Sequence, residues 1–140
     1  MIFLYIDKIS LVVRYAETDK MGIVHHSNYY IWFEMARSEF IKKIGINYSE
    51  LEEENIMMPL VETHCKYYEG AKYDDKIRIE TNVDELTPVK VIFAYNVIRE
   101  KDNKLLAKGK TVQAFVNQNF KIINLKKNYN ELWEKLQLLK

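Results

Sequence analysis

Residues 28–44 read NYYIWFEMARSEFIKKI, and this stretch decides the architecture of the chain. Drawn as a helix, it is apolar around most of its circumference. Two of its polar interruptions, Glu34 and Arg37, are three residues apart, a spacing that favours an ion pair on a helix. A helix with so few polar residues is buried on several sides. We therefore expect a central helix that the rest of the chain surrounds.

Both ends of this helix carry recognisable signals. Ser27 or Asn28 can cap the first turn, because a short polar side chain accepts hydrogen bonds from the free N–H groups there. Gly45 can end the helix near Ile44 by adopting a left-handed conformation.

The remaining residues read mostly as strands. Ile9, Leu11 and Val13 alternate with more polar neighbours, which predicts a first strand before the helix. The alternation from Ile77 to Asp84 is the clearest of four later stretches, which lie near residues 57–69, 75–86, 89–101 and 104–119. A short helical turn is expected over 48–54, a hairpin at 102–103 and a last helix over about 128–139.

Strands that follow one another without helices between them predict antiparallel pairing and an α+β fold. We expect the four later strands to form a meander. The sequence thus predicts a curved antiparallel sheet of about five strands wrapped around the long central helix. Such a sheet has two exposed edges, and pairing of edges into a dimer is one way to cover them.

Length and composition narrow the function classes. The 140 residues suit a single domain over 1–140, and a hydrophobic content of 48% excludes a disordered chain. The formal charge of +1 gives no sign of a nucleic-acid or anionic-membrane partner. The apolar start, Met1–Ile6, is too short to span a bilayer and lacks the basic residues of a signal peptide. With a single cysteine, the chain fits a reducing cytoplasm.

The candidate chemistry lies just before the central helix, in the run from Tyr15 to Tyr29. This run contains Asp19, Gly22 and the pair His25-His26. Backbone N–H groups are unpaired where a helix begins, and the helix dipole is positive there. A carboxylate beside them can attack, or activate water against, a carbonyl whose oxygen the N–H groups hold. That is the minimal equipment for acyl transfer.

Two motifs resemble those of a known family. The first is Thr18-Asp19-x-x-Gly22-x-Val24-x-His26-x-x-Tyr29, followed by Phe33-Glu34-x-Ala36-Arg37. The second is Tyr67-Tyr68-x-x-Ala71-x-Tyr73-Asp74-Asp75. Both resemble the hotdog-fold acyl-CoA thioesterases of the 4-hydroxybenzoyl-CoA thioesterase-like group, and within it the YbgC-type branch. The chain departs from the pattern at Gly70, where the family commonly has Pro.

The resemblance implies a fold, an assembly and a substrate class. The family wraps an antiparallel sheet around a long helix, forms homodimers that often pair into tetramers, and places its active sites at the dimer interface. Its substrates are acyl-CoA thioesters and, in some members, acyl-carrier-protein thioesters. It uses no metal or redox cofactor, and coenzyme A enters only as part of the substrate.

The resemblance also suggests roles for individual residues. Asp19 would act as general base on water or as a nucleophile, and the sequence leaves both routes open. At position 26 the backbone N–H polarises the thioester carbonyl, and the imidazole of His26 is implicated too. Tyr15 matches a tyrosine thought to assist at the site. The candidates for substrate contact are Gly22, Val24, Ser27 and Asn28.

Other residues with reactive side chains are expected to have structural rather than catalytic roles. His25 and His26 lack further ligands at metal spacing, and adjacent histidines rarely point the same way, so we expect no metal site. Cys65 and His64 lie in an expected strand without triad partners. Some hotdog thioesterases use an acid on the helix, but Asp19 already fills that role, so Glu34 is expected to be structural.

Three alternatives and one open question accompany the main hypothesis. Hotdog dehydratases carry a catalytic histidine in a different local pattern, often with Pro-Gly after it, which this chain lacks. An acyl-CoA sensor would need a DNA-binding helix pair, for which the chain has no room. A carrier-protein thioesterase stays open. So does the identity of the residues that meet the phosphates of coenzyme A, for which the candidates are Lys66, Lys72, Lys90, Arg99 and Lys101.

Overall fold

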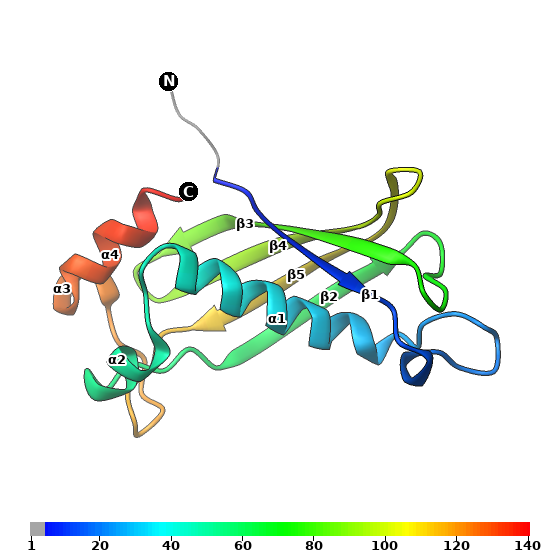
Figure 1. Ribbon diagram of the computed structural model, residues 1–140. Helices are drawn as coiled ribbons and strands as arrows, with labels where there is room; N and C mark the ends of the chain where they lie inside the picture. Colours follow the sequence, from blue (N-terminus) through cyan, green and yellow to red (C-terminus); the bar gives the residue numbers. More distant parts are fainter. Residues whose placement is uncertain (1–4) are drawn as a thin grey trace.

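The computed structural model describes residues 5–140, in which a five-stranded sheet curves behind the long helix α1 (Ser27–Lys43) (Figure 1). The start of the apolar leader, residues 1–4, lies outside the described residues. The strands are β1 (Asp7–Val12), β2 (Leu60–Tyr67), β3 (Lys76–Thr87), β4 (Lys90–Arg99) and β5 (Lys104–Ala114). The predicted α+β fold, with a long helix against an antiparallel sheet, is therefore confirmed.

The strand order is β1-β3-β4-β5-β2, with every neighbouring pair antiparallel. The prediction that all four later strands form a meander is wrong for β2. β1 occupies the edge of β3, with Leu11 opposite Ile77, and β2 crosses to the far edge, where Tyr67 pairs with Ala107 of β5. β3, β4 and β5 do form a meander. Asn103 takes the left-handed conformation at the β4–β5 hairpin, where the sequence predicted a turn.

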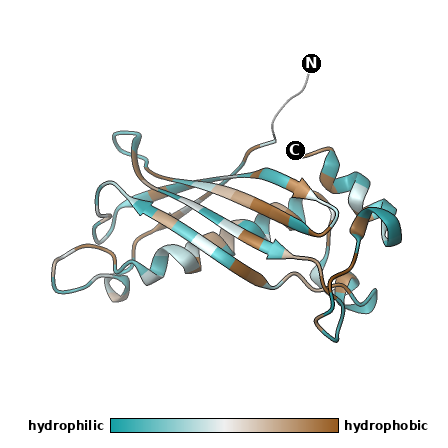
Figure 2. Ribbon diagram, turned by 180° about the vertical axis from the view of Figure 1, so that it is seen from behind, coloured by the Kyte–Doolittle hydropathy of each residue, from teal (hydrophilic) through white to brown (hydrophobic). Residues whose placement is uncertain are grey.

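The central helix packs closely on the sheet, and one glycine permits this approach. The ring of Phe33 stacks on Tyr95 with ring centroids 4.4 Å apart. A Cβ atom at Gly109 of β5 would lie 2.4 Å from the same Phe33 ring, closer than real atoms come. Figure 2 shows apolar and polar bands alternating along the strands, as expected for a sheet with one face on the core. The predicted burial of the helix is confirmed for the side that faces the sheet, whereas on the opposite side Ile31 and Met35 are 49% and 46% exposed.

The polar residues around this helix differ from expectation. His26 is the N-cap residue, whereas Ser27 and Asn28, the predicted caps, use their side chains elsewhere. Gly45 does end the helix in a left-handed conformation, with φ of 81°. The predicted ion pair between Glu34 and Arg37 is wrong: no such pair occurs among residues 5–140, because Arg37 turns toward the sheet and donates to the Tyr95 hydroxyl at 3.1 Å.

Two of the strand predictions, 57–69 and 104–119, extended too far. β5 ends at Ala114 rather than near residue 119, and β2 begins at Leu60 rather than near residue 57. Beyond these ends only single bridges remain, such as Met57 with Val116. The chain then turns at Asn117, whose side chain accepts hydrogen bonds from the N–H groups of two later residues.

The C-terminal helical region is also divided. The predicted helix over about 128–139 consists of α3 (Leu125–Asn128) and α4 (Asn130–Gln137), because Tyr129 adopts a non-helical conformation between them. The Tyr129 hydroxyl donates to the backbone oxygen of Glu54 at 3.0 Å, beside the predicted helical turn α2 (Tyr48–Glu53). α2, α3 and α4 lie near the end of the sheet that is opposite the start of α1 (Figure 1). No helix between residues 5 and 140 is long and apolar enough to cross a bilayer.

Candidate active site

The segment from Thr18 to Val24 forms a closed loop just before α1. Thr18 and Val24 pair as an isolated β-bridge, and the Asp19 N–H donates to the Ile23 oxygen at 2.9 Å. The Gly22 N–H returns to the Asp19 oxygen at 3.0 Å, with Gly22 at φ of 80°. Left-handed backbone of this kind favours glycine, so Gly22 has the turn-forming role that its position suggested.

Only one of the two Asp19 carboxylate oxygens accepts a hydrogen bond within this loop. Its Oδ1 atom accepts a hydrogen bond from the Met21 N–H at 2.9 Å. Its Oδ2 atom accepts none from any residue between 5 and 140. Asp19 therefore serves the turn through one oxygen and leaves the other one available.

The start of α1 supplies a free donor close to this loop. The first helical N–H groups are partly satisfied locally, since Asn28 N–H donates to the His25 oxygen at 3.0 Å and Tyr29 N–H to the His26 oxygen at 3.2 Å. The His26 N–H, in contrast, has no hydrogen-bond partner in the described part of the chain. Such a donor at a helix N-terminus is suited to hold an oxygen that gains negative charge.

Asp19, Val24 and His26 line one pocket of about 260 Å³. Its other walls come from the loop itself, from α1, from the last residue of β2 and from the segment that follows this strand. They are Met21, Ile23, Tyr29, Tyr67, Tyr68, Glu69 and Gly70. The pocket is thus mainly apolar and aromatic, with a carboxylate, a second acid and a histidine in its wall. Three of the residues that the sequence singled out are brought together here.

Glu17 anchors the loop, a role that the sequence did not reveal. The residue is 4% exposed, and its carboxylate accepts hydrogen bonds from the Arg14 N–H and from the Trp32 indole N–H, both at 2.8 Å. Its backbone oxygen accepts from the His25 N–H at 2.9 Å and from the Asn28 side chain at 3.0 Å. Glu17 therefore ties the beginning and the end of the loop to α1. No local pattern links positions 17 and 32, so sequence reasoning had no signal for this contact.

Tyr67 supports the start of the helix from the opposite wall. Its hydroxyl donates to the His26 backbone oxygen at 3.3 Å, and its ring meets Tyr29 edge-on at 5.0 Å between centroids. Burial raises the pKa of Tyr67, with further contributions from Cys65 and Tyr30, so the hydroxyl keeps its proton as a donor. Burial likewise raises the pKa of Tyr29. The sequence placed Tyr67 in a matching motif but gave it no role.

Several predicted site residues lie outside the pocket wall. Tyr15 is 77% exposed and packs edge-on against Tyr73, so its predicted assistance in catalysis stays a prediction. Ser27 Oγ is 2.8 Å from the His25 ring, and the Asn28 side chain donates to the Glu17 backbone oxygen.

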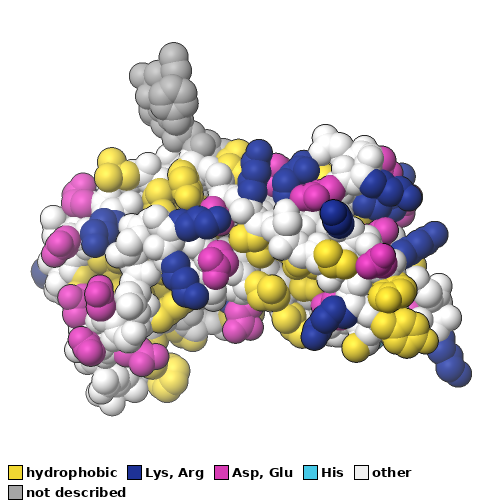
Figure 3. Space-filling view, viewed as in Figure 1, with side chains coloured by type: hydrophobic (Ala, Val, Ile, Leu, Met, Phe, Trp, Pro, Cys, Tyr) yellow, Lys and Arg dark blue, Asp and Glu magenta, His cyan; other side chains and the backbone are white. Residues whose placement is uncertain are grey.

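Hydrophobic side chains gather on the surface at the end where α1 begins, which lies to the lower right in Figure 3.

The described residues offer no group of three or more His, Cys, Asp or Glu side chains placed to hold a metal ion. The His25 and His26 rings pack against each other with centroids 4.2 Å apart. His64 lies on β2 and pairs with Glu62 at 2.7 Å, and Cys65 is half-buried beside it.

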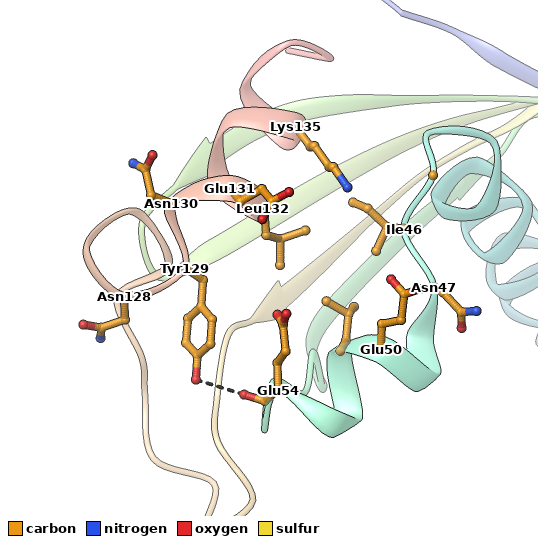
Figure 4. A pocket seen from close by; sticks show the side chains of 12 residues that line it. Ile46, Asn47, Glu50, Glu54, Asn128, Tyr129, Asn130, Glu131, Leu132 and Lys135 are labelled. Atoms are coloured by element: carbon orange, nitrogen blue, oxygen red, sulfur yellow. Dashed lines mark hydrogen bonds between the residues drawn. The ribbon is translucent and has the colours of Figure 1, made fainter.

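A different hollow, of about 450 Å³, lies at the other end of α1. Side chains of α2 and α4 face each other across it, and the Tyr129–Glu54 hydrogen bond closes one side (Figure 4). Glu50, Glu54 and Glu131 give it an acidic character. The first turns of α2 and α4 line this hollow, but its walls hold no histidine and none of the motif residues, so the pocket of Asp19 and His26 is the better candidate.

Comparison with known proteins agrees with this geometry. Residues 13–127 match the family described as the thioesterase-like superfamily. The chain belongs to this superfamily. The predicted identification as a hotdog-fold thioesterase is therefore confirmed, and this thioesterase carries its loop and pocket within the matched region.

Named relatives are similar over most of their length. The acyl-CoA thioesterase YbgC of Haemophilus influenzae is 32% identical over 102 residues, which are 72% of this chain and 73% of that protein. The DHNA-CoA thioesterase from Staphylococcus aureus superposes with a TM-score of 0.88 at 30% identity, covering 94% and 89% of the two chains. The gentisyl-coenzyme A thioesterase BH1999 superposes with a TM-score of 0.75 at 27% identity, covering 83% and 93%.

Proposed function

We propose that this thioesterase hydrolyses acyl-CoA thioesters in the pocket lined by Asp19 and His26. The observation that carries the proposal is that Asp19, with one oxygen available, and His26, with its N–H unpartnered at the start of α1, line the same pocket. The first group can activate or deliver a nucleophile, and the second can stabilise the negative oxygen that the attack creates. The names of the relatives support coenzyme A as the thiol portion.

The reaction follows from these two groups. A water molecule attacks the thioester carbonyl while Asp19 takes its proton, and the carbonyl oxygen becomes an oxyanion held by the His26 N–H. The tetrahedral intermediate then collapses, the carbon–sulfur bond breaks, and the sulfur leaves with the proton as the free thiol. The products are a carboxylic acid and coenzyme A. Direct attack by Asp19, giving a mixed anhydride that water then cleaves, is the second route consistent with the same contacts.

The decisive experiment compares native protein with Asp19→Asn. The asparagine keeps an Oδ1 acceptor for the Met21 N–H, so the turn is retained while the basic carboxylate is lost. We expect thiol release from a panel of acyl-CoA substrates to fall by about 10²–10⁴-fold, the usual contribution of a general base. Equal rates in the two proteins, with unchanged melting temperature, would refute the assignment of Asp19.

The thiol portion and the cofactor requirement need separate tests. The same acyl group is presented on coenzyme A and on acyl-carrier protein, and we expect faster release from coenzyme A.

We also propose that the reaction needs no metal ion, because the carboxylate and the N–H group supply the base and the oxyanion site. Activity that survives dialysis against EDTA supports this, and activity restored only by an added metal contradicts it.

We further propose that the protein acts as a homodimer paired through a sheet edge. β2 is an edge strand whose residues Leu60, Val61 and Tyr67 are exposed, although strands of this kind are usually covered or paired. The pocket lies beside the end of this strand, so a partner there would contribute to its walls. Sedimentation at micromolar concentration is expected to give a dimer or a pair of dimers, and a monomer would remove this proposal.

A further inference from the structure

Gly70 lies in the pocket wall, in the connection between β2 and β3, where the family commonly has a larger residue. A Cβ atom at Gly70 would lie 2.6 Å from Ile23 Cγ2 and 2.8 Å from Ile23 Cβ. Real Cβ atoms essentially never approach other atoms so closely. The backbone at Gly70 is not left-handed, so the reason for glycine here is steric. The Ile23 side chain occupies the space that a side chain at position 70 would need.

The backbone of Ile23 cannot move away from Gly70 without disturbing the loop that carries Asp19. The Ile23 oxygen accepts the Asp19 N–H at 2.9 Å, which holds one end of the loop. The adjacent Val24 N–H donates to the Ala71 oxygen at 2.8 Å, which ties the loop to the segment that contains Gly70. Because both bonds keep the loop against this segment, extra volume at position 70 goes into the pocket that Gly70 and Ile23 both line.

We propose that the Gly70–Ile23 contact sets the width of the acyl pocket and admits acyl groups wider than a straight alkyl chain. This inference rests on the proposed function. The pocket measures about 260 Å³ and has the rings of Tyr29, Tyr67 and Tyr68 in its walls, which suits a flat apolar group. Gly70 is therefore a specificity-determining residue, and benzoyl-CoA represents the class of substrate that it favours.

The test compares kcat/KM for benzoyl-CoA and butyryl-CoA in native protein and in two single variants. Gly70→Ala is expected to lower the benzoyl-to-butyryl ratio about tenfold, the low end of what one methylene group changes in an apolar pocket. Ile23→Gly removes the Cβ and Cγ2 atoms of the same contact and is expected to raise the ratio. This second variant keeps the proposal testable if Gly70→Ala folds poorly.

A double variant and a matched glycine serve as controls. Ile23→Gly combined with Gly70→Ala makes room for the added methyl group because Ile23 Cβ is removed as well, so the ratio is expected to return to within about threefold of the native value. Gly109→Ala also forces a Cβ into an occupied space, but against Phe33 in the core. It is expected to lower stability and leave the ratio unchanged.

The outcomes separate this inference from the proposed function. If native protein releases thiol from butyryl-CoA and Gly70→Ala leaves the ratio unchanged or raises it, the specificity role is wrong while the hydrolase assignment stands. An unrestored ratio in the double variant also overturns the specificity role. If native protein matches Asp19→Asn on every substrate, the proposed function itself fails.

Discussion

The indole N–H of Trp32, on the second turn of α1, donates a 2.8 Å hydrogen bond to Glu17 Oε2, just ahead of the loop that carries Asp19. The other carboxylate oxygen of Glu17 accepts the Arg14 N–H. One buried carboxylate thus joins the segment that follows β1, the loop and the central helix. The position of Asp19 relative to the His26 N–H depends on this junction.

Trp32→Phe removes the indole donor and keeps an aromatic ring in the core. We expect it to lower the free energy of unfolding by about 1–3 kcal/mol, because a buried carboxylate oxygen loses its partner. We also expect kcat to fall, because the loop is no longer fixed on α1. Denaturant unfolding and steady-state thiol release measure the two effects.

Trp133→Phe is the matched control, because Trp133 is a buried tryptophan of α4 far along the chain from the site. It is expected to cost stability without a specific loss of kcat. If both variants lower kcat equally, the Glu17–Trp32 contact has no special part in placing Asp19.

The close approach of helix and sheet gives a second prediction. Gly109→Ala would place a methyl group 2.4 Å from the Phe33 ring, so the helix or the strand must shift. Overpacking of this kind typically costs about 1–3 kcal/mol. Urea unfolding is expected to show a lower midpoint. A midpoint equal to that of native protein would mean that the contact between α1 and β5 is looser than the structure indicates.

Local patterns were sufficient to predict most of the fold. The alternation through Ile77, Ile79 and Val83 predicted a strand with a buried face, and these residues are buried in β3. Gly45 marked the end of α1 correctly. Strand order was harder, because nothing in the local sequence of β2 says that its partner is β5 rather than β3. That choice depends on β1, which takes the free edge of β3.

In the candidate site, too, the residues that are close in sequence could be predicted and the contacts between distant residues could not. Asp19, Val24 and His26 lie within eight residues of one another, and the motif that contains them predicted a shared pocket. Glu17 reaches Trp32 across 15 positions and Tyr67 reaches His26 across 41, so these contacts appear only once the chain is folded. The Glu34–Arg37 ion pair failed because tertiary packing gave Arg37 a better partner, the Tyr95 hydroxyl.

A third prediction concerns the ion pair between Lys43 and Asp7. Lys43 Nζ lies 2.8 Å from Asp7 Oδ1, and the other oxygen of this buried carboxylate has no partner among the described residues. Lys43→Met leaves the carboxylate buried without its counter-ion. We expect the free energy of unfolding to fall by about 1–3 kcal/mol, the usual penalty for an unsatisfied buried polar group. Lys42→Met is the control, because Lys42 forms an exposed ion pair with Glu39. This substitution is expected to lower the free energy of unfolding by less.

The same pair makes stability depend on pH at the alkaline end. The hydrogen bond to Asp7 raises the pKa of Lys43 above its ordinary value. The folded state therefore binds this proton more tightly than the unfolded state does. The resulting stabilisation is complete below about pH 10 and is lost as pH rises through the folded-state pKa. Native protein is expected to lose more stability than Lys43→Met between pH 10 and 12, and parallel curves for the two proteins would contradict this.

The last prediction uses Cys65, the single cysteine of the chain, as a probe of the strand beside the pocket. Burial raises the pKa of the Cys65 thiol, and the thiolate is the reactive form. We therefore expect slow reaction with a disulfide reagent at pH 7.5 in the native state and fast reaction in urea. The native rate should continue to rise with pH above the ordinary thiol range. A native rate equal to the rate in urea would show that β2 opens readily and that the wall formed by Tyr67 is not rigid.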